Sequence, residues 1–529
     1  SQLSQSSETE EEEEEDDETL HSSYFLTAVP KIESLFRRCQ ECGEAIDQTS
    51  VEKKQVASAL SVTYQCMGCK EFFRWDSQPK KGKGKSQVFE LNQSLPVAAF
   101  VTGTPIPRFI EMCDLLSVGI PRERSMRDSI RHYACPAIDR VYDEWEQEAR
   151  TLSKDTAPEE GIIVALDGQF DSPGYCASAC KVAAFDASLK LIIGAVSLSL
   201  TDPGIEGKSC RMETFGAEKV LELLVDDGFN VRTRVTDSNA SVDKRIRDNP
   251  KLAHIEAMRD FWHVQKPLKK EWAKCMKLAS CPTLSVWYKS FINHLYFVNK
   301  RYPKREDRPL ALEYVRSFVY HFSGKHKWRK HEDFKLISKC LHCGSRAKRG
   351  KKGKKGEKAK EQKELVEVDS EEYRLVYEML FTKSFEKAFL ACSPEVGTSM
   401  CECFHSMSLM YSPKRFYAAP IYFNKKMKLS VLHSNSLVYS ELAGERVEMG
   451  DCLLPRKGRI AISVKRKMSK GKHPWRREII EECWKVREDY EDKRYFKRIG
   501  APEDDLFDIL MIEYEKIVRG EEIDADEGD

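Results

Sequence analysis

The clearest pattern in the chain is a change of hydrophobic period near residue 160. Before it, residues 96–155 carry apolar side chains at every third or fourth position, which is typical of helices. Beyond it, apolar residues alternate or form solid runs, which favours strands. A β-β-β-α-β unit is therefore predicted, with elements at 161–168, 175–187, 189–200, 212–228 and 230–237.

The helical period returns after this unit. Residues 246–390 are predicted to be mostly helical, and 391–440 to return to the sheet with a helix of their own. A Gly/Lys-rich insert at 346–363 interrupts the helices. We expect it to be a flexible loop that contacts phosphate, serves in nuclear import or is simply solvated. Residues 441–520 are predicted to be basic and helical.

Charge is unevenly distributed along the chain. The 529 residues carry a net charge of +1, but residues 1–20 hold ten acids and 521–529 hold six, which leaves +17 on the rest. We expect the acidic segments 1–23 and 521–529 to be solvated tails. The basic remainder favours a polyanionic partner. No apolar run is long enough to span a membrane and the N-terminus lacks a signal-peptide pattern, so an intracellular protein is expected.

The cysteines indicate a metal site. With eighteen cysteines and no signal-peptide pattern, paired CxxC motifs are better explained by zinc than by disulfides, which predicts a reducing compartment. Two such pairs can close one tetrahedral zinc site within a module at 24–95. The alternative is four merely buried cysteines. The predicted ligands are Cys39, Cys42, Cys66 and Cys69.

A second cysteine cluster is less complete. Cys340, His342 and Cys343 form a CLHC motif, and His326 and His331 lie upstream. Because only one CxxC pair is present, a second zinc site stays an open hypothesis.

Three acids have an order that suggests metal chemistry. Asp167 and Asp237 each close a predicted strand, and Glu402 lies in a predicted helix. Carboxylates placed in this way can converge on two Mg²⁺ or Mn²⁺ ions, as in RNase H-like enzymes. The alternative is another α/β sheet in which strand-end aspartates cap turns.

Several motifs together resemble Kolobok-type cut-and-paste DNA transposases and host proteins derived from them. The motifs are DGQFDSPGYCASACKVAAFD, VTDSN, DFWHVQKPLKKEW, TSMCECFHSMSLMYSPKRF and VLHSN, and the likeness runs from about residue 36 to about 440. It implies an RNase H-like core whose catalytic triad is Asp167, Asp237 and Glu402. Asp260 and His263 match an acid-x-x-His motif of these transposases. The chain departs from the pattern at Gln169 and Ser238, where basic residues are expected.

Other residues near these motifs have simpler explanations. Taken alone, the motif predicts that His263 pairs with Asp260 within one helical turn. The resemblance implies instead that His263 contacts phosphate or transfers a proton beside the metals. Trp262 is expected in the core rather than as a base-stacking surface. Packing roles are also expected for His132, Cys135, Cys401 and Cys403.

The predicted fold class is α/β, an RNase H-like mixed sheet (159–245 and 391–440) interrupted by a large helical insertion (246–390). A zinc-binding module (24–95) and a helical region (96–158) precede it. The resemblance implies Mg²⁺- or Mn²⁺-dependent cleavage and transfer of double-stranded DNA, with transposon ends and target DNA as partners, in a nuclear homo-oligomer. The alternatives are a non-catalytic DNA-binding or chromatin protein that keeps the fold, and a nuclease that cuts without joining.

Overall fold

The computed structural model describes residues 24–82, 87–173, 176–237, 239–341, 364–394, 396–414, 417–455 and 462–490. Two compact units divide the chain. The first consists of Ser1–Gln93 with Met112–Arg122, and the second of Ser94–Glu111 with Glu123–Asp529. Residues 112–122, which their pattern assigned to the helical region, thus belong to the first unit. None of the described helices combines the length and apolarity that a membrane span requires.

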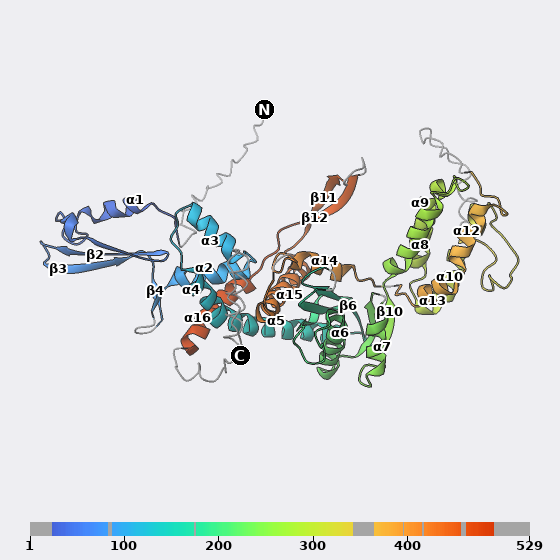
Figure 1. Ribbon diagram of the computed structural model, residues 1–529, viewed down its shortest axis with the longest axis horizontal. Helices are drawn as coiled ribbons and strands as arrows, with labels where there is room; N and C mark the ends of the chain where they lie inside the picture. Colours follow the sequence, from blue (N-terminus) through green and yellow to red (C-terminus); the bar gives the residue numbers. More distant parts are fainter. Residues whose placement is uncertain are drawn as a thin grey trace, which may run out of the picture. The chain divides into compact units, whose positions relative to one another are not determined.

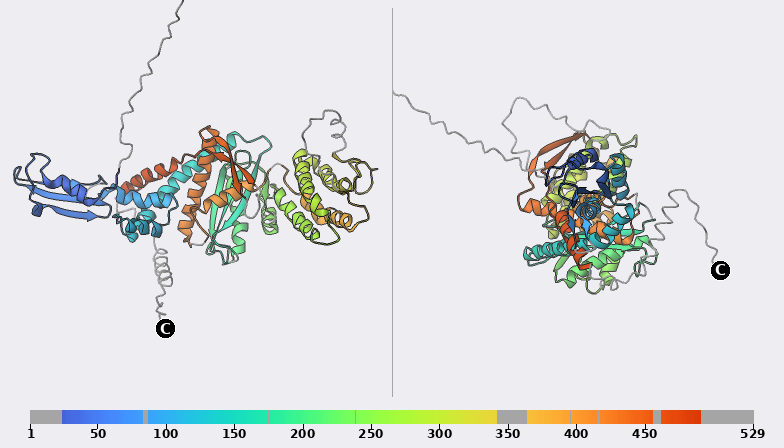
Figure 2. Two further views of the ribbon diagram at one scale, coloured as in Figure 1. Left: turned by 90° about the horizontal axis from the view of Figure 1, so that it is seen from above. Right: turned by 90° about the vertical axis from the view of Figure 1, so that its left-hand side faces the viewer.

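The first unit is built on a three-stranded antiparallel sheet of order β1-β2-β3, drawn in blue in Figure 2. The central strand is the most buried, and its residues Val62 and Tyr64 pack with Phe36 in a small core. The elements are α1 (Val29–Glu33), β1 (Glu52–Val56), β2 (Ala59–Cys66), β3 (Glu71–Asp76), β4 (Lys80–Lys81) and β5 (Val88–Phe89).

The second unit contains a five-stranded mixed sheet of order β10-β9-β6-β7-β8 (Figure 1). Strands β6, β9 and β10 run parallel, whereas β6, β7 and β8 pair antiparallel. This confirms the predicted α/β class with a mixed sheet. The bounds are β6 (Ile162–Phe170), β7 (Ala179–Asp186), β8 (Ile192–Ser199), β9 (Val231–Thr236) and β10 (Glu256–Arg259).

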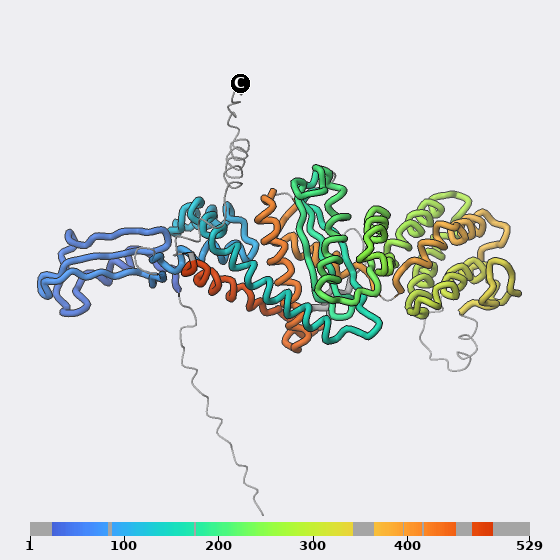
Figure 3. The backbone as a smooth tube through the Cα atoms, turned by 90° about the horizontal axis from the view of Figure 1, so that it is seen from below, coloured from blue at the N-terminus to red at the C-terminus, as the bar shows by residue number. Residues whose placement is uncertain are grey.

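Each face of this sheet has its own core because side chains alternate along the strands. Val164 and Leu166 of β6 pack under α6 (Ser209–Asp226) and α7 (Ala240–Asp248). Ala165 between them faces the opposite core, which also includes α5 (Cys135–Asp155) and α16 (Trp475–Tyr490). Figure 3 shows α16, in red, lying along α5. The same face carries α14 (Ser399–Ser408) and α15 (Pro420–Leu442).

Helices make up most of the remaining described parts, as the 3.6-residue period predicts. The predicted helical region contains α2 (Glu90–Val101), α3 (Ile106–Leu115) and α4 (Glu123–Ser129) besides α5. The predicted insertion packs around a separate aromatic-rich core that includes Trp272, Phe291 and Phe318. Its helices are α8 (Phe261–Cys275), α9 (Leu284–Arg301), α10 (Arg308–Arg316), α11 (Phe318–Phe322), α12 (Glu371–Leu380) and α13 (Lys383–Leu390).

Two secondary-structure predictions are wrong in part, although α16 confirms a helix within the predicted helical region 441–520. Residues 256–259 form the edge strand β10, because parallel pairing with β9 stabilises a segment too short to show a period of its own. The region after residue 441, predicted to be helical, begins with the antiparallel hairpin of β11 (Glu448–Pro455) and β12 (Ile462–Met468). The acidic tails and the basic insert 346–363 lie outside the described residues.

Candidate functional site

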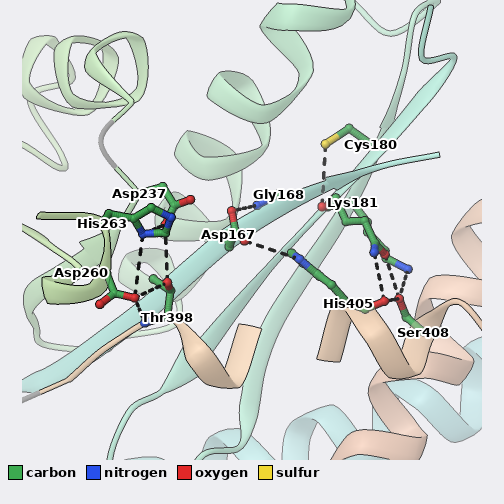
Figure 4. Close-up of polar contacts among 11 residues, drawn as sticks. Asp167, Gly168, Cys180, Lys181, Asp237, Asp260, His263, Thr398, His405 and Ser408 are labelled. Carbon is green, nitrogen blue, oxygen red and sulfur yellow. Dashed lines mark hydrogen bonds and ion pairs between the residues drawn. The ribbon is translucent and has the colours of Figure 1, made fainter. Parts of the chain in front are cut away.

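Three aspartates lie in a row across three adjacent strands, just beyond their parallel-paired residues, at positions set by the strand register. Ala165 pairs with Val235 and Arg259 pairs with Thr236 in parallel ladders. One or two residues further along each strand stand Asp167, Asp237 and Asp260. The carboxyl ends of adjacent parallel strands are where open α/β sheets place their ligand sites. Figure 4 shows these three side chains together.

Both carboxylate oxygens of Asp260 accept hydrogen bonds from the starts of two helices. Its Oδ1 accepts from the Trp262 backbone N–H at 2.8 Å, which caps the N-terminus of α8. Its Oδ2 accepts from both the backbone N–H (3.0 Å) and the hydroxyl (2.8 Å) of Thr398. Thr398 is the N-cap residue of α14. Asp260 therefore ties the start of α14 to the end of β10.

His263 lies closer to Asp237 than to its expected partner. Its Nδ1 is 2.9 Å from Asp237 Oδ1 but 3.9 Å from Asp260 Oδ2. The Thr398 hydroxyl also lies 3.4 Å from Asp237 Oδ1. The predicted pairing of His263 with Asp260 is therefore the longer of its two contacts, and the shorter one belongs to a network around Asp237 and Thr398 (Figure 4).

Glu402 is exposed in the first turn of α14, the helix that Asp260 and Thr398 anchor. Its negative charge is one of those that raise the pKa of Asp167. The carboxylates of Asp167, Asp237 and Glu402 do not form a group with all ligand atoms within 4.8 Å of one another, the spacing expected around a single ion. Carboxylates that share two ions roughly 4 Å apart are spread more widely.

Burial, and after it repulsion by neighbouring acids, raises the pKa of the carboxyl groups at this site. Burial, followed by the charges of Asp237 and Glu213, raises the pKa of Asp167 from 3.8 to about 7. Burial also raises the pKa of Asp237 and of Glu213. Glu213 lines the same pocket as the two aspartates and packs over Gly168, where an added Cβ would lie 2.7 Å from its Cγ. Sequence reasoning missed Glu213, because nothing distinguishes it from other polar residues of the amphipathic α6.

A polar network connects Asp167 to α14. His405 Nδ1 lies 3.5 Å from Asp167 Oδ2, and its backbone carbonyl accepts from Gln169 Nε2 at 3.0 Å. Ser408 donates to Gln169 and accepts from the buried Lys181, each at 2.8 Å. Burial lowers the pKa of His405 to about 3 and of Lys181 to about 7. His405, three residues after Glu402, could have been found from this helical spacing.

The raised pKa of Asp167 predicts a stability that depends on pH. Between the two pKa values, 3.8 and about 7, the folded protein keeps a proton on Asp167 that the unfolded chain releases. Without Mg²⁺, the free energy of unfolding should therefore fall as pH rises from about 4 to 7, by about 4 kcal/mol at most. Asp167→Asn should remove that part of the loss and raise the melting temperature at pH 8. Calorimetry of zinc-loaded protein without Mg²⁺ at pH 5 and 8 measures this. Asp248→Asn, at an exposed site on α7, is the control and should leave the pH dependence unchanged.

The four predicted zinc ligands are brought together in the first unit. Their Sγ atoms all lie within 4.8 Å of one another, with 3.9 Å between Cys39 and Cys69 and 3.5 Å between Cys42 and Cys66. Thiolates on tetrahedral zinc are roughly 3.8 Å apart. The backbone N–H of Cys42 lowers the pKa of Cys39 to about 7, which favours its thiolate, whereas hydrogen bonds within the group, first that with Cys42, raise the pKa of Cys69. This group could hold zinc.

Predictions for the neighbouring side chains have mixed outcomes. Trp262 was expected in the core, but its side chain is 41% exposed. It stands two residues after the cap residue Asp260 and lies beside Lys266, whose Nζ is 4.7 Å from the ring centre. Cys401 is buried, as packing requires, whereas Cys403 is exposed. Cys135, the first residue of α5, is buried in the core.

Neither a scan against protein-family models nor a comparison with curated protein sequences finds a match for this chain.

Proposed function

We propose that this chain cleaves and transfers DNA strands with an Asp-Asp-Glu site, as a Kolobok-type transposase or a protein derived from one. The proposal depends mainly on the row of three aspartates just beyond the parallel-paired residues of β6, β9 and β10, and on the helix of Glu402 that Asp260 and Thr398 attach to it. Along the chain, β6, β7, β8, α6 and β9 follow the predicted β-β-β-α-β order, and β9 runs parallel to β6, which supports the same proposal.

Asp167, Asp237 and Glu402 are the residues that would hold the metal. Their donors are all carboxylate oxygens, which Mg²⁺ and Mn²⁺ prefer, and burial together with the neighbouring negative charges raises the pKa of Asp167. The donor set therefore fits a divalent cation. When bound, two such ions would supply activation of the attacking oxygen and stabilisation of the leaving oxygen.

The surrounding residues would act by positioning. Asp260 is 7% exposed and its two oxygens already accept three hydrogen bonds, so it is better suited to fixing α14 than to binding metal. His263 would fix the Asp237 carboxylate and add positive charge when protonated. Of the two positions at which a basic residue is expected, position 238 has a counterpart in His263, near Asp237. His405 lies near Asp167, but with a pKa lowered to about 3 it brings no positive charge.

The exposed pair of Trp262 and Lys266 offers a surface suited to DNA. An aromatic face with a cation above it can contact a base and a phosphate together. Both residues lie in the first two turns of α8, next to His263. Trp262→Ala is therefore expected to weaken DNA binding without lowering metal-dependent stabilisation.

The basic body predicts DNA affinity that falls steeply with salt, because each neutralised phosphate releases counterions. Deleting 346–363, which carries ten Lys or Arg and two Glu, should reduce the slope of log affinity against log salt. Deleting the acidic residues 1–20 is the opposite-charge control and should leave the slope unchanged or steeper. Fluorescence anisotropy over a salt series measures both. A flat dependence in the full chain would remove the argument from charge.

The direct test uses the purified full chain and DNA ends taken from its own genomic flanks. With Mg²⁺ or Mn²⁺ we expect strand nicks at the ends and joined products on denaturing gels. Cutting without joining would indicate a nuclease. Tight binding without any cleavage would reject the enzyme and favour the non-catalytic DNA-binding protein.

A further inference from the structure

A second cluster of metal-binding side chains lies in the helical part of the second unit. His321, His326 and Cys340 offer ligand atoms that all lie within 4.8 Å of one another. His321 belongs to α11, and the other two stand at the base of the loop that follows it. His326 Nδ1 is 3.4 Å from His321 Nδ1 and 3.3 Å from Cys340 Sγ.

These separations agree with ligands on one tetrahedral ion. Zinc–nitrogen bonds of about 2.05 Å place two nitrogens roughly 3.3 Å apart, and a zinc–sulfur bond of about 2.3 Å places nitrogen and sulfur roughly 3.5 Å apart. Hydrogen bonds alone explain the cluster less well. An imidazole nitrogen offers one in-plane position, so His326 Nδ1 cannot make a good hydrogen bond to both neighbours.

The backbone is arranged to bring the ligands together. Gly324, with a φ of +80°, turns the chain after α11. The Cys340 N–H then donates to the His326 carbonyl at 3.1 Å, and Lys327 and Lys339 form the next antiparallel bridge. Pairing of the two chain segments therefore sets the separation of His326 from Cys340 independently of their side chains.

The geometry points to a different set of ligands from the CLHC motif considered from the sequence. His331 is engaged elsewhere: its Nε2 lies 3.0 Å from the Tyr320 hydroxyl, and its Nδ1 accepts from the Asp333 N–H at 3.4 Å. His342 and Cys343 lie outside the described residues. The sequence motif did not include His321, because the fold brings it to the cluster from the preceding helix.

We propose that His321, His326 and Cys340 bind a zinc ion. Two imidazoles and a thiolate are borderline-soft donors that select zinc over Mg²⁺. The core of this loop is small, with Trp328, Phe334, Ile337 and Cys340 as its buried residues. A bound ion would supplement that core by fastening the loop to α11.

The site also has a position that suits it to anchoring the basic insert. Cys340 comes six residues before residue 346, where the insert begins. On the other side of the insert, the Val366 N–H donates to the Phe322 carbonyl at 3.1 Å, and Phe322 directly follows the proposed ligand His321. Zinc would therefore hold Cys340, before the insert, next to His321, and the adjacent Phe322 holds Val366, after the insert.

The test is the zinc content of the full chain, measured by mass spectrometry of the metal against protein concentration. Wild type should carry two zinc ions per chain, one on the four cysteines of the first unit and one here. His326→Ala and Cys340→Ser should each carry one. His331→Ala, which changes a neighbouring histidine outside the cluster, should keep two. Two ions in Cys340→Ser, or a single ion in wild type, would overturn the proposal.

A cobalt titration gives a second measurement that does not depend on these variants folding. A chain with Cys39→Ser and Cys66→Ser should still bind one Co²⁺ tightly, with the thiolate charge-transfer absorption of a single cysteine. Absence of that absorption would contradict the site. Neither experiment measures DNA cleavage, so failure of the proposed enzyme and failure of this metal site are distinguishable.

Discussion

Glu402→Gln is expected to eliminate DNA nicking and joining, lowering both rates by at least about 10³-fold, while DNA affinity stays within about twofold. Glutamine keeps the shape of glutamate but loses the charge that would hold the metal. Glu402 is exposed and occupies no core, so the replacement should not unfold α14. The loss would then come from the chemistry and not from the fold.

The measurement compares strand cleavage by wild type and variant at saturating Mn²⁺, with anisotropy to confirm DNA binding. Glu378→Gln is a matched control, because Glu378 is also an exposed helical glutamate and pairs with Arg374 on α12, away from the three aspartates in sequence. It should cleave like wild type. Equal cleavage by Glu402→Gln and wild type would exclude Glu402 from the site and, with it, the proposed triad.

The row of aspartates was predictable in part because strand ends have a strong sequence signal. Asp167 follows the apolar run IIVAL and Asp237 directly follows β9, and the register of the parallel strands places the two close together. The first strand is longer than predicted, because pairing with β7 continues β6 to Phe170. Asp260 has no such signal. It follows β10, a strand of four residues that exists only because β9 offers it backbone partners, so the sequence predicted a helix there.

Other parts of the site depend on contacts between distant segments. Glu213 reaches the aspartates because α6 packs on the sheet over Gly168, and Thr398 reaches Asp260 across 138 positions of sequence. No local pattern reports such contacts. The same limit explains Trp262, whose apolar character predicted burial although α8 leaves its side chain exposed.

Zinc sites are easier to predict because the ligands themselves carry the signal. The four cysteines of the first unit were identified from two CxxC pairs alone, and the structure brings all four together. The His321 cluster shows where this fails. Two of its ligands, His321 and His326, lie outside the CxxC pattern, and the turn at Gly324 brings His321 to the others.

Removing the metal from the first unit is expected to unfold it. Its core has six buried residues, and two of them, Cys39 and Cys66, are themselves predicted ligands. Structural zinc contributes about 10–16 kcal/mol of apparent binding free energy in zinc-finger peptides, more than so small a core can replace. Cys66→Ser should therefore lower hydrogen-exchange protection of the β2 amides by about 10³-fold or more.

Hydrogen exchange read by mass spectrometry resolves the two units within the full chain, so it separates local unfolding from a general loss of structure. Strands β6 and β7 of the second unit should keep their protection in Cys66→Ser, since they have separate cores. Cys210→Ser, at an exposed cysteine on α6, is the matched control and should change neither unit. If β2 stays protected in Cys66→Ser, the four cysteines are packing residues, and the first unit is stabilised by its apolar core alone.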